Sequence, residues 1–187
     1  MRRYIVLDIE TLHGVNFGSI RAKGGYFKPH TDAAWARVWP AQVCAVLFDG
    51  VEELDRINTT IDWGAAAPPL DNPYCPRLTP AEIANGMSPG SFFASMQDLS
   101  RGVDAFVGYN VGFDMGALRH HAAVLGRPLP RVEDVCLMRT AARRMGQARW
   151  PKLITAYETI CGVKADEAQA HDAAYDVMMT ISLLRAL

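Results

Sequence analysis

The chain of 187 residues is long enough for one domain with a substantial core, and half of its residues are hydrophobic. Its formal net charge of −1 gives no overall attraction to nucleic acid or acidic membranes, so any such binding must come from local patches. No apolar run approaches a membrane span, and four scattered cysteines without CxxC spacing indicate neither a zinc site nor a disulfide framework. We expect a single domain over residues 1–187, without a signal peptide or membrane contact, in the cytoplasm.

The first predicted element is a strand over residues 4–11 that ends in two carboxylates. Because successive strand side chains alternate between faces, Asp8 and Glu10 project from one face and Ile9 from the other. Two adjacent anions repel each other, and a hard divalent cation such as Mg²⁺ or Mn²⁺ would relieve that repulsion. A strand end that runs into solvent is the alternative explanation for the pair.

A long irregular segment, about residues 12–40, follows this strand. A connection of this length within a compact domain is usually functional or disordered. Its basic residues are interleaved with aromatic ones, a mixture that suits a single nucleic-acid strand, because cations pair with phosphates and rings stack on bases. Tyr26 and Phe27 are predicted to form an exposed tip. Trp35 and Trp39 are more simply explained as packing the segment onto the second strand.

The remaining elements are strands at first and mostly helices later. Further strands are predicted over residues 42–48, 56–63 and 103–109, the first two joined by a hairpin turn. Helices are predicted from the capping signature at residues 79–82, over 89–100, 114–125, 135–145 and 150–161, and from near 171 to the end. This order favours an α/β fold in which a three-stranded antiparallel meander plus parallel strands form a mixed sheet covered by helices.

Other acids and a histidine lie where they could join the first pair. Asp114 falls in the first turn after the fourth strand, where the helix dipole alone favours an acid. In the last helix, Asp172 and Asp176 are four residues apart and share a face. His171 lies about 140° from Asp176 around an ideal helix, so both reach one site only if His171 precedes the helix. A surface or capping role is the ordinary explanation for such a histidine.

Three motifs together resemble those of the DEDD superfamily: Asp8-Ile9-Glu10, Asn110-Val111-Gly112-Phe113-Asp114 and His171-Asp172-Ala173-Ala174-Tyr175-Asp176. This superfamily contains 3′–5′ exonucleases of the DnaQ-like, proofreading type on a ribonuclease-H-like fold. A His five residues before the last Asp resembles the DEDDh branch. The DEDDy branch would have Tyr four residues before that Asp, where this chain has Asp172. The resemblance extends from Arg3 to the C-terminus.

The resemblance implies a metal-dependent 3′–5′ exonuclease that acts on the 3′ ends of single-stranded DNA or RNA, with DNA favoured. Four carboxylates would hold two Mg²⁺ or Mn²⁺ ions, one ion activating the attacking water and one stabilising the leaving oxygen: Asp8, Glu10, Asp114 and Asp176. His171 would be the general base. Asp172 is a second candidate for the last ligand, and the spacing from His171 favours Asp176.

By the same resemblance, residues near the acids would contact the substrate. Thr11 and Leu12 would pack on the terminal nucleotide, and Phe113 would lie beside its base or sugar. The full set of candidates is Ile9, Thr11, Leu12, Asn110 and Phe113. Many relatives have Thr where this chain has Ile9, and a short turn where it has the 12–40 segment. Both departures leave the ligand set intact but affect substrate geometry.

Other functions are compatible with parts of this pattern. Residues 139–152 carry five basic residues and no acid, and they either contact phosphates or form a solvated face. A nuclease-fold binding or polymerase-accessory module without turnover is the alternative function. The complete acid set argues against it, because a pure binder has no need to crowd anions where phosphates approach. A small-molecule phosphodiesterase is a third interpretation. The pattern leaves open a polymerase in trans, the DNA or RNA preference, the pathway and the oligomeric state.

Overall fold

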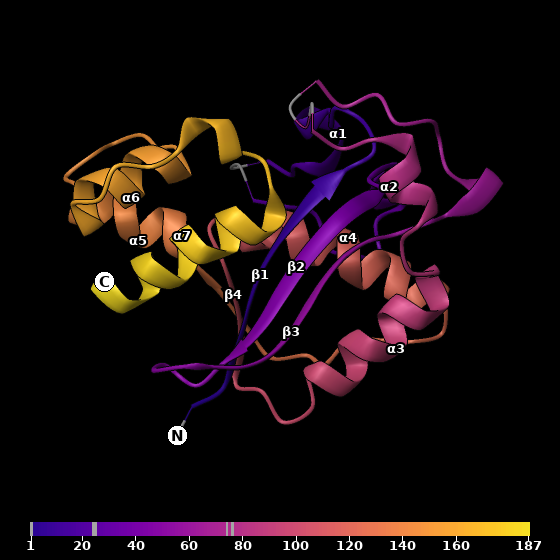
Figure 1. Ribbon diagram of the computed structural model, residues 1–187, viewed down its shortest axis with the longest axis horizontal. Coiled ribbons are helices and arrows are strands. Elements are labelled where there is room, and N and C mark those ends of the chain that lie inside the picture. The colour runs from indigo at the N-terminus through magenta and orange to yellow at the C-terminus, as the bar shows by residue number, and fades with distance from the viewer. Residues whose placement is uncertain (1, 24–25, 74, 76) are drawn as a thin grey trace.

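A computed structural model describes residues 2–23, 26–73, 75 and 77–187. Within these residues, five strands form one sheet in the order β3-β2-β1-β4-β5 (Figure 1). The strands are β1 (Tyr4–Thr11), β2 (Pro40–Phe48), β3 (Glu53–Thr60), β4 (Ala105–Gly108) and β5 (Glu133–Cys136). The first three are antiparallel neighbours, whereas β4 pairs parallel with β1 and β5 pairs parallel with β4. The predicted mixed sheet, with its antiparallel meander and parallel strands, is confirmed.

Helices cover both faces of the sheet, as Figure 1 shows. One face packs against α3 (Pro89–Leu99) and α4 (Val111–Val124), and the other against α5 (Leu137–Arg144), α6 (Leu153–Cys161) and α7 (Ala173–Ala186). The short elements are α1 (Phe17–Ile20), η1 (Ala33–Arg37), η2 (Gly64–Ala66), α2 (Pro80–Ala84) and η3 (Glu167–Gln169). None of the helices within the described residues has the length and apolarity that a membrane crossing requires.

The alternation along β1 decides which layer receives the acids. Ile5, Leu7 and Ile9 are buried in the core shared with α3 and α4. Val6 is buried on the opposite face, in the core shared with α5, α6 and α7. Asp8 and Glu10 follow Val6 at intervals of two residues, so they point toward the layer that contains α7.

The 12–40 segment is folded onto the body of the protein. Trp35 is fully buried, and its indole N–H donates to the carbonyl oxygen of Lys28 at 3.0 Å. The indole lies so close to Gly116 of α4 that a Cβ at that position would overlap it. Trp39 packs against the rings of Trp63 and His121, each with ring centroids 5.1 Å apart. Both tryptophans pack the segment, as expected, but Trp35 does so through α4.

The predicted exposed tip of Tyr26 and Phe27 is only half right. Tyr26 is 63% exposed, whereas Phe27 is partly buried and packs against the core. The ring centroid of Phe27 lies 5.9 Å from that of Trp35 and 6.1 Å from that of Phe113. Phe27 therefore holds the segment in place, and only Tyr26 presents its ring to solvent.

The main correction concerns the region after α4. Residues 133–136 form β5, which was not expected from the sequence, and the helix expected over 135–145 begins only at Leu137. The strand is four residues long and contains two acids, so it has neither the length nor the apolar pattern of a buried strand. The next helix begins at Leu153, not at Trp150, and ends at Cys161; Gly162, which follows it as the C-cap, has a φ of 69°.

Candidate active site

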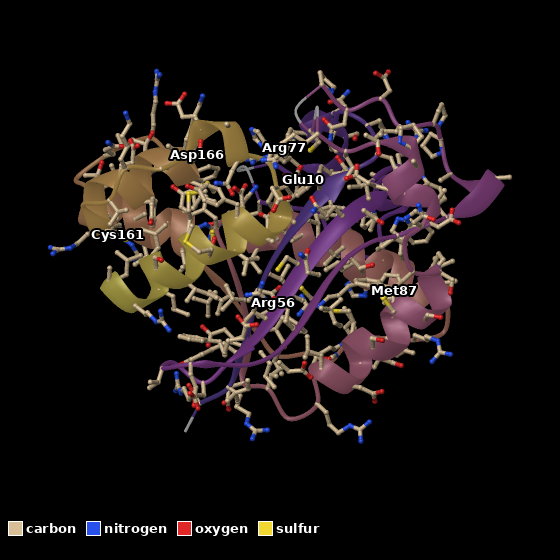
Figure 2. All side chains as sticks on the ribbon, in the orientation of Figure 1. Glu10, Arg56, Arg77, Met87, Cys161 and Asp166 are labelled. Atoms are coloured by element: carbon tan, nitrogen blue, oxygen red, sulfur yellow. The ribbon has the colours of Figure 1, made fainter. Side chains whose placement is uncertain are left out.

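The predicted site residues meet where β1 ends and where α4 and α7 begin. Asp114 lies in the first turn of α4 and Asp176 in the first turn of α7. The Asp114 carboxylate accepts a hydrogen bond from the backbone N–H of Ile9 at 3.3 Å, which ties α4 to β1. Potential ligand atoms of Glu10, His171 and Asp176 all lie within 4.8 Å of one another. Figure 2 shows Glu10 near the end of β1.

His171 lies in the turn before α7, which is the position the predicted site requires. Its backbone has a φ of 61°, in the left-handed region that non-glycine residues rarely occupy. Its Nδ1 is 3.9 Å from Oε1 of Glu10, and its side chain is 54% exposed. The left-handed turn therefore brings the imidazole to the acids while one side of the ring stays open to solvent.

Asp172 caps α7. One carboxylate oxygen accepts from the backbone N–H groups of Ala174 and Tyr175, both at 3.1 Å. The other accepts from the side-chain amide of Gln42 at 3.3 Å. Both oxygens of Asp172 thus have partners within the protein, which favours Asp176 as the acid that α7 offers to a ligand.

The four carboxyl groups of Asp8, Glu10, Asp114 and Asp176 lie close together in a buried setting, which disfavours their charged forms and raises their pKa values. Burial raises the pKa of Asp8 well above its usual value, and the charges of Asp114 and Asp176 raise it further. Burial raises the pKa of Glu10 to about 8 and that of Asp114 to about 7. Burial, followed by repulsion from Asp172, raises the pKa of Asp176 to about 7. A divalent cation would relieve the same repulsion that protons relieve here, so the donor set fits a metal site.

Cys75 is a neighbour of this site that the sequence did not reveal. Its thiol is buried and donates to Oε2 of Glu10 at 2.5 Å. The hydrogen bond opposes the effect of burial on the pKa of Glu10. Asn72, from the same segment, donates to the backbone carbonyl of Thr11 at 2.7 Å. The proline-rich stretch before Cys75 has no motif, so only the three-dimensional arrangement connects it to Glu10.

The candidates for substrate contacts on β1 and after it are largely enclosed. The side chain of Ile9 is 5% exposed within the core, which leaves only its backbone facing the site. Thr11 is also buried, and its hydroxyl donates to the carbonyl oxygen of His13 at 2.9 Å. Leu12 is 3% exposed, but it lines a cavity of about 230 Å³ together with Trp63. Ile9 could therefore contact a substrate only through its backbone, and its role in substrate binding stays a prediction.

The candidates at the start of α4 are more accessible. Asn110 occupies the N-cap position of α4 without a capping side-chain bond, and it lines a second cavity together with Gly112. Phe113 is partly buried, with ring centroids 5.5 Å from Phe17 and 6.2 Å from Trp35. These contacts fix the position of the Phe113 ring in the first turn of α4.

Three solved structures with a similar fold are described as exonucleases or as an RNase domain. Exonuclease I of E. coli, in a zinc-bound complex with single-stranded DNA, matches with a TM-score of 0.71 and 19% identity over 100% of this chain. A 3′-exonuclease that recognises the 3′ end of a histone mRNA stem-loop matches with a TM-score of 0.69 and 12% identity, covering 98% of this chain and 80% of its own. The RNase domain of the yeast Pop2 protein matches with a TM-score of 0.58 and 10% identity, covering 97% and 75%. This chain spans 40% of the exonuclease I chain. These matches confirm the predicted ribonuclease-H-like fold.

Sequence comparison identifies the family. No curated protein matched the chain. A family model described as Exonuclease, RNase_T, matches residues 40–184, which is more than half of the chain. The match begins after β1, so Asp8 and Glu10 lie outside it, while Asp114, His171 and Asp176 lie within it. The chain therefore belongs to the RNase_T exonuclease family, as the three motifs predicted.

Proposed function

We propose that this protein is a metal-dependent 3′–5′ exonuclease of the DEDDh branch, which removes nucleotides from the 3′ end of a single strand. The observation that carries the proposal is that four buried or partly buried carboxylates and one imidazole gather at the end of β1, with ligand atoms of Glu10, His171 and Asp176 within 4.8 Å of one another. Asp8 and Glu10 come from β1, Asp114 from α4, and His171 and Asp176 from the start of α7. Membership of an exonuclease family supports a hydrolytic role for that cluster.

The carboxylates of Asp8, Glu10, Asp114 and Asp176 would hold two divalent ions, Mg²⁺ or Mn²⁺. An oxygen-only donor set suits these ions, and the raised pKa values of the four acids support a need for compensating positive charge. When bound, such ions would activate the attacking water and stabilise the leaving oxygen.

Residues of the chain would orient the metal-binding carboxylates and accept the proton that the attacking water loses. His171 would accept the proton of the attacking water, for which the imidazole must be neutral. Burial of part of its ring, followed by repulsion from Lys152, lowers the pKa of His171, which favours the neutral ring. The backbone N–H of Ile9 orients Asp114, and the Cys75 thiol orients Glu10.

The proposed substrate is a single strand with a free 3′ hydroxyl, with DNA favoured and RNA accepted. Two of the similar structures, exonuclease I with single-stranded DNA and the 3′-exonuclease that recognises a histone mRNA stem-loop, support a nucleic-acid substrate. Leu12, Asn110 and Phe113 would contact the terminal nucleotide, together with the backbone around Ile9 and Thr11. The proposal covers free 3′ ends and ends presented by a polymerase in trans.

The test uses 5′-labelled DNA and RNA oligonucleotides with Mn²⁺ or Mg²⁺, followed over time. We expect a ladder that shortens stepwise from the 3′ end, with mononucleotides as the other product. A strand with a blocked 3′ end should resist, and Asp8→Asn serves as the inactive control. Cleavage of a circular single strand would identify an endonuclease instead. Binding without metal-dependent cleavage would identify a nuclease-fold binding module.

A further inference from the structure

A groove with exposed cations and exposed rings runs from the start of α4 to the end of α5. It consists of two adjoining cavities of about 490 Å³ and about 240 Å³, which share Tyr26, Arg139 and Trp150. We call it the Arg–aromatic groove and define it by Arg21, Tyr26, Arg139, Arg143, Gln147 and Trp150. Its two sides come from the 12–40 segment and from α5 with the residues that follow.

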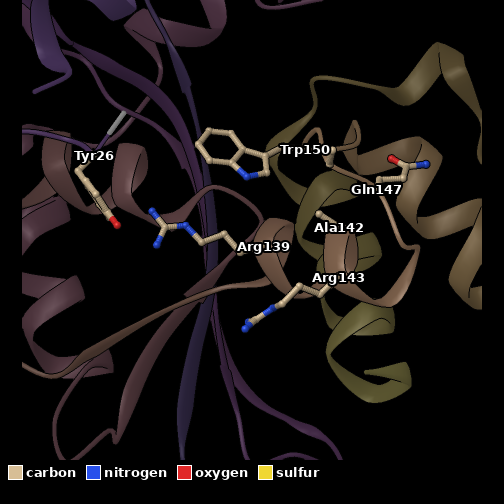
Figure 3. A pocket seen from close by; sticks show the side chains of 7 residues that line it. Tyr26, Arg139, Ala142, Arg143, Gln147 and Trp150 are labelled. Atoms are coloured by element: carbon tan, nitrogen blue, oxygen red, sulfur yellow. The ribbon is translucent and has the colours of Figure 1, made fainter. Parts of the chain in front are cut away.

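The two rings present large flat surfaces to solvent. Tyr26 is 63% exposed and Trp150 is 47% exposed. A guanidinium group lies beside each ring: Arg139 is 5.4 Å from the Tyr26 centroid, and Arg21 is 5.5 Å from the Trp150 centroid. Figure 3 shows the side chains of Tyr26, Arg139 and Trp150 converging, with Arg143 on the same side as Arg139. Exposed rings of this kind offer stacking surfaces to bases, which all have a π face.

The groove arginines of α5 have no acidic partner within the described part of the chain. Arg139 and Arg143 are four residues apart on one helix, so their like charges share a face and repel each other. Among the described residues, neither forms an ion pair with a carboxylate, and none of those lining the larger cavity is acidic. The smaller cavity is lined by one acid, Asp134, which is already paired with Arg119. An anion bound between these arginines would relieve their repulsion. A chain of phosphates is such an anion.

One end of the groove lies at the start of α4, the helix that carries Asp114 in its first turn. The smaller cavity is also lined by Asn110 and Gly112, which come shortly before Asp114 in the chain. A strand whose 3′ end lies at the acids can therefore continue along the groove with its 5′ side.

We propose that the Arg–aromatic groove binds the nucleotides on the 5′ side of the scissile bond, as a single strand and without sequence preference. Bases stack on Tyr26 and Trp150, and phosphates pair with Arg139 and Arg143. The direction of the strand rests on the proposed function, because the 3′ end must reach the acids. The groove extends recognition beyond the terminal nucleotide, so the enzyme favours long single strands over short ones.

The test measures binding of a labelled dodecamer and a labelled trimer by fluorescence anisotropy, in the Asp8→Asn background so that the strand is not degraded. Arg143→Ala and Arg144→Ala are matched variants, because both residues are exposed in the last turn of α5 but only Arg143 lines the groove. Arg143→Ala should weaken dodecamer binding more than Arg144→Ala does. In Arg139→Ala/Arg143→Ala, the slope of log K against log salt should fall by about 1.4, or about 0.7 for each phosphate that is no longer neutralised.

The stacking contact is tested with substitutions of Trp150. Trp150→Leu should weaken dodecamer binding by about tenfold, since one base no longer stacks, whereas Trp150→Phe should retain most of the affinity. Trimer binding should change less than dodecamer binding in each groove variant. Equal losses in Arg143→Ala and Arg144→Ala, with an unchanged salt slope in the double variant, would overturn the proposal, because the groove would then be general surface charge.

The test of the groove can fail or succeed independently of the test of the exonuclease activity. Wild-type protein is tested in parallel for cleavage of the dodecamer and of a small chromogenic phosphodiester. If the groove variants behave as expected but wild-type protein cleaves neither substrate, the groove stands and the exonuclease proposal fails. If the wild type cleaves both but Arg143→Ala equals Arg144→Ala, the exonuclease proposal stands and the groove fails.

Discussion

The acid cluster and the Arg–aromatic groove lie beside each other but are built in opposite ways. The cluster places Glu10 and Asp114 at 8% and 3% exposure, held by a strand and a helix start. The groove places Arg139, Arg143 and Trp150 at exposed positions on α5 or after it. Substitutions in the acid cluster should therefore change both the stability of the protein and its catalytic rate. Substitutions in the groove should change the binding of nucleic acid and have little effect on stability.

Electrostatics makes the same distinction. Like charges in the cluster repel one another in a buried setting, so the four acids oppose folding of the metal-free protein. Like charges in the groove are exposed to solvent, which screens their repulsion. Changes at the two regions should consequently have different signatures in activity, stability and pH dependence.

The largest expected effect is on turnover at His171. His171→Ala should bind metal and nucleic acid but cleave about 10²–10⁴-fold more slowly, because the general base is missing. Wild-type activity should fall as pH decreases through the lowered pKa of His171, below the ordinary value of 6.5, because a protonated ring cannot accept a proton. Single-turnover rates measured across pH check both statements.

The left-handed backbone at position 171 requires a matched control. Asn tolerates a φ near 61° better than Ala does, so His171→Asn preserves the turn while removing the base. Both variants should be slow if the imidazole transfers the proton. An active His171→Asn beside an inactive His171→Ala would show that only the turn matters, and the DEDDh assignment would have to be withdrawn.

The second effect contrasts a buried indole with an exposed one. Trp35→Ala should reduce the free energy of unfolding by about 3–5 kcal/mol, because Trp35 is fully buried against α4. Trp150→Ala should change it by only about 0.5 kcal/mol, because Trp150 is 47% exposed. Urea denaturation measures both. Similar losses in the two variants would mean that the groove is part of the core.

The third effect is the pH dependence of stability in the metal-free protein. The folded pKa values of Glu10 (about 8), Asp114 (about 7) and Asp176 (about 7) exceed their ordinary values of 4.5, 3.8 and 3.8. The folded state thus binds more protons than the unfolded state between about pH 4 and about pH 8. These carboxyls contribute most stability below their unfolded pKa, and that contribution is lost as pH rises through the folded pKa. In EDTA, the melting temperature should fall across this range.

Divalent ions should reverse that fall. Mn²⁺ binds the folded state, so it should raise the melting temperature, and most strongly at the upper end of the range, where protons no longer neutralise the acids. Asp8→Asn removes one repelling charge and one ligand, so both the fall in EDTA and the rise with Mn²⁺ should be smaller. An EDTA-treated protein whose melting temperature increases from about pH 4 to about pH 8 would contradict the buried acid cluster.

The parts of the fold that the sequence predicted best are those with strong local signals. The predicted bounds of β1 match the observed ones, because its apolar run and alternation are unambiguous. The capping box of Thr79 and Glu82 was also predicted correctly, because capping depends on residues a few positions apart. The short strand β5 was missed, because pairing with β4 defines it and its own four residues do not.

The site residues follow the same rule: features set by nearby residues in the sequence were predicted, and contacts between distant segments were not. Spacing along the chain placed Asp114 at the start of a helix, and it required His171 to precede the last helix if both were to reach one site; both residues lie at those positions. It gave no sign of the Cys75 thiol on Glu10, because that contact joins segments 65 residues apart. Nor did it distinguish Phe27 from Tyr26, since their different burial depends on Trp35 and the α4 surface.

The smallest expected effect separates these two neighbours. Tyr26→Ala should change the free energy of unfolding by only about 0.5 kcal/mol, because the ring is 63% exposed and its described ring contact is the cation–π pair with Arg139. Phe27→Ala should cost more, because its ring packs against Trp35 and Phe113 and lies directly against Gly112. Both variants should weaken the binding of single strands, but for different reasons. Tyr26→Ala should do so in a protein of normal stability, because only the exposed ring is lost. Phe27→Ala should do so because the 12–40 segment is no longer held in place. Tyr26→Phe, which keeps the ring, is the control for the first and should bind close to wild type. If Tyr26→Ala lowered the melting temperature as much as Phe27→Ala, the segment would be one structural unit, and its exposed ring would have no separate role in the groove.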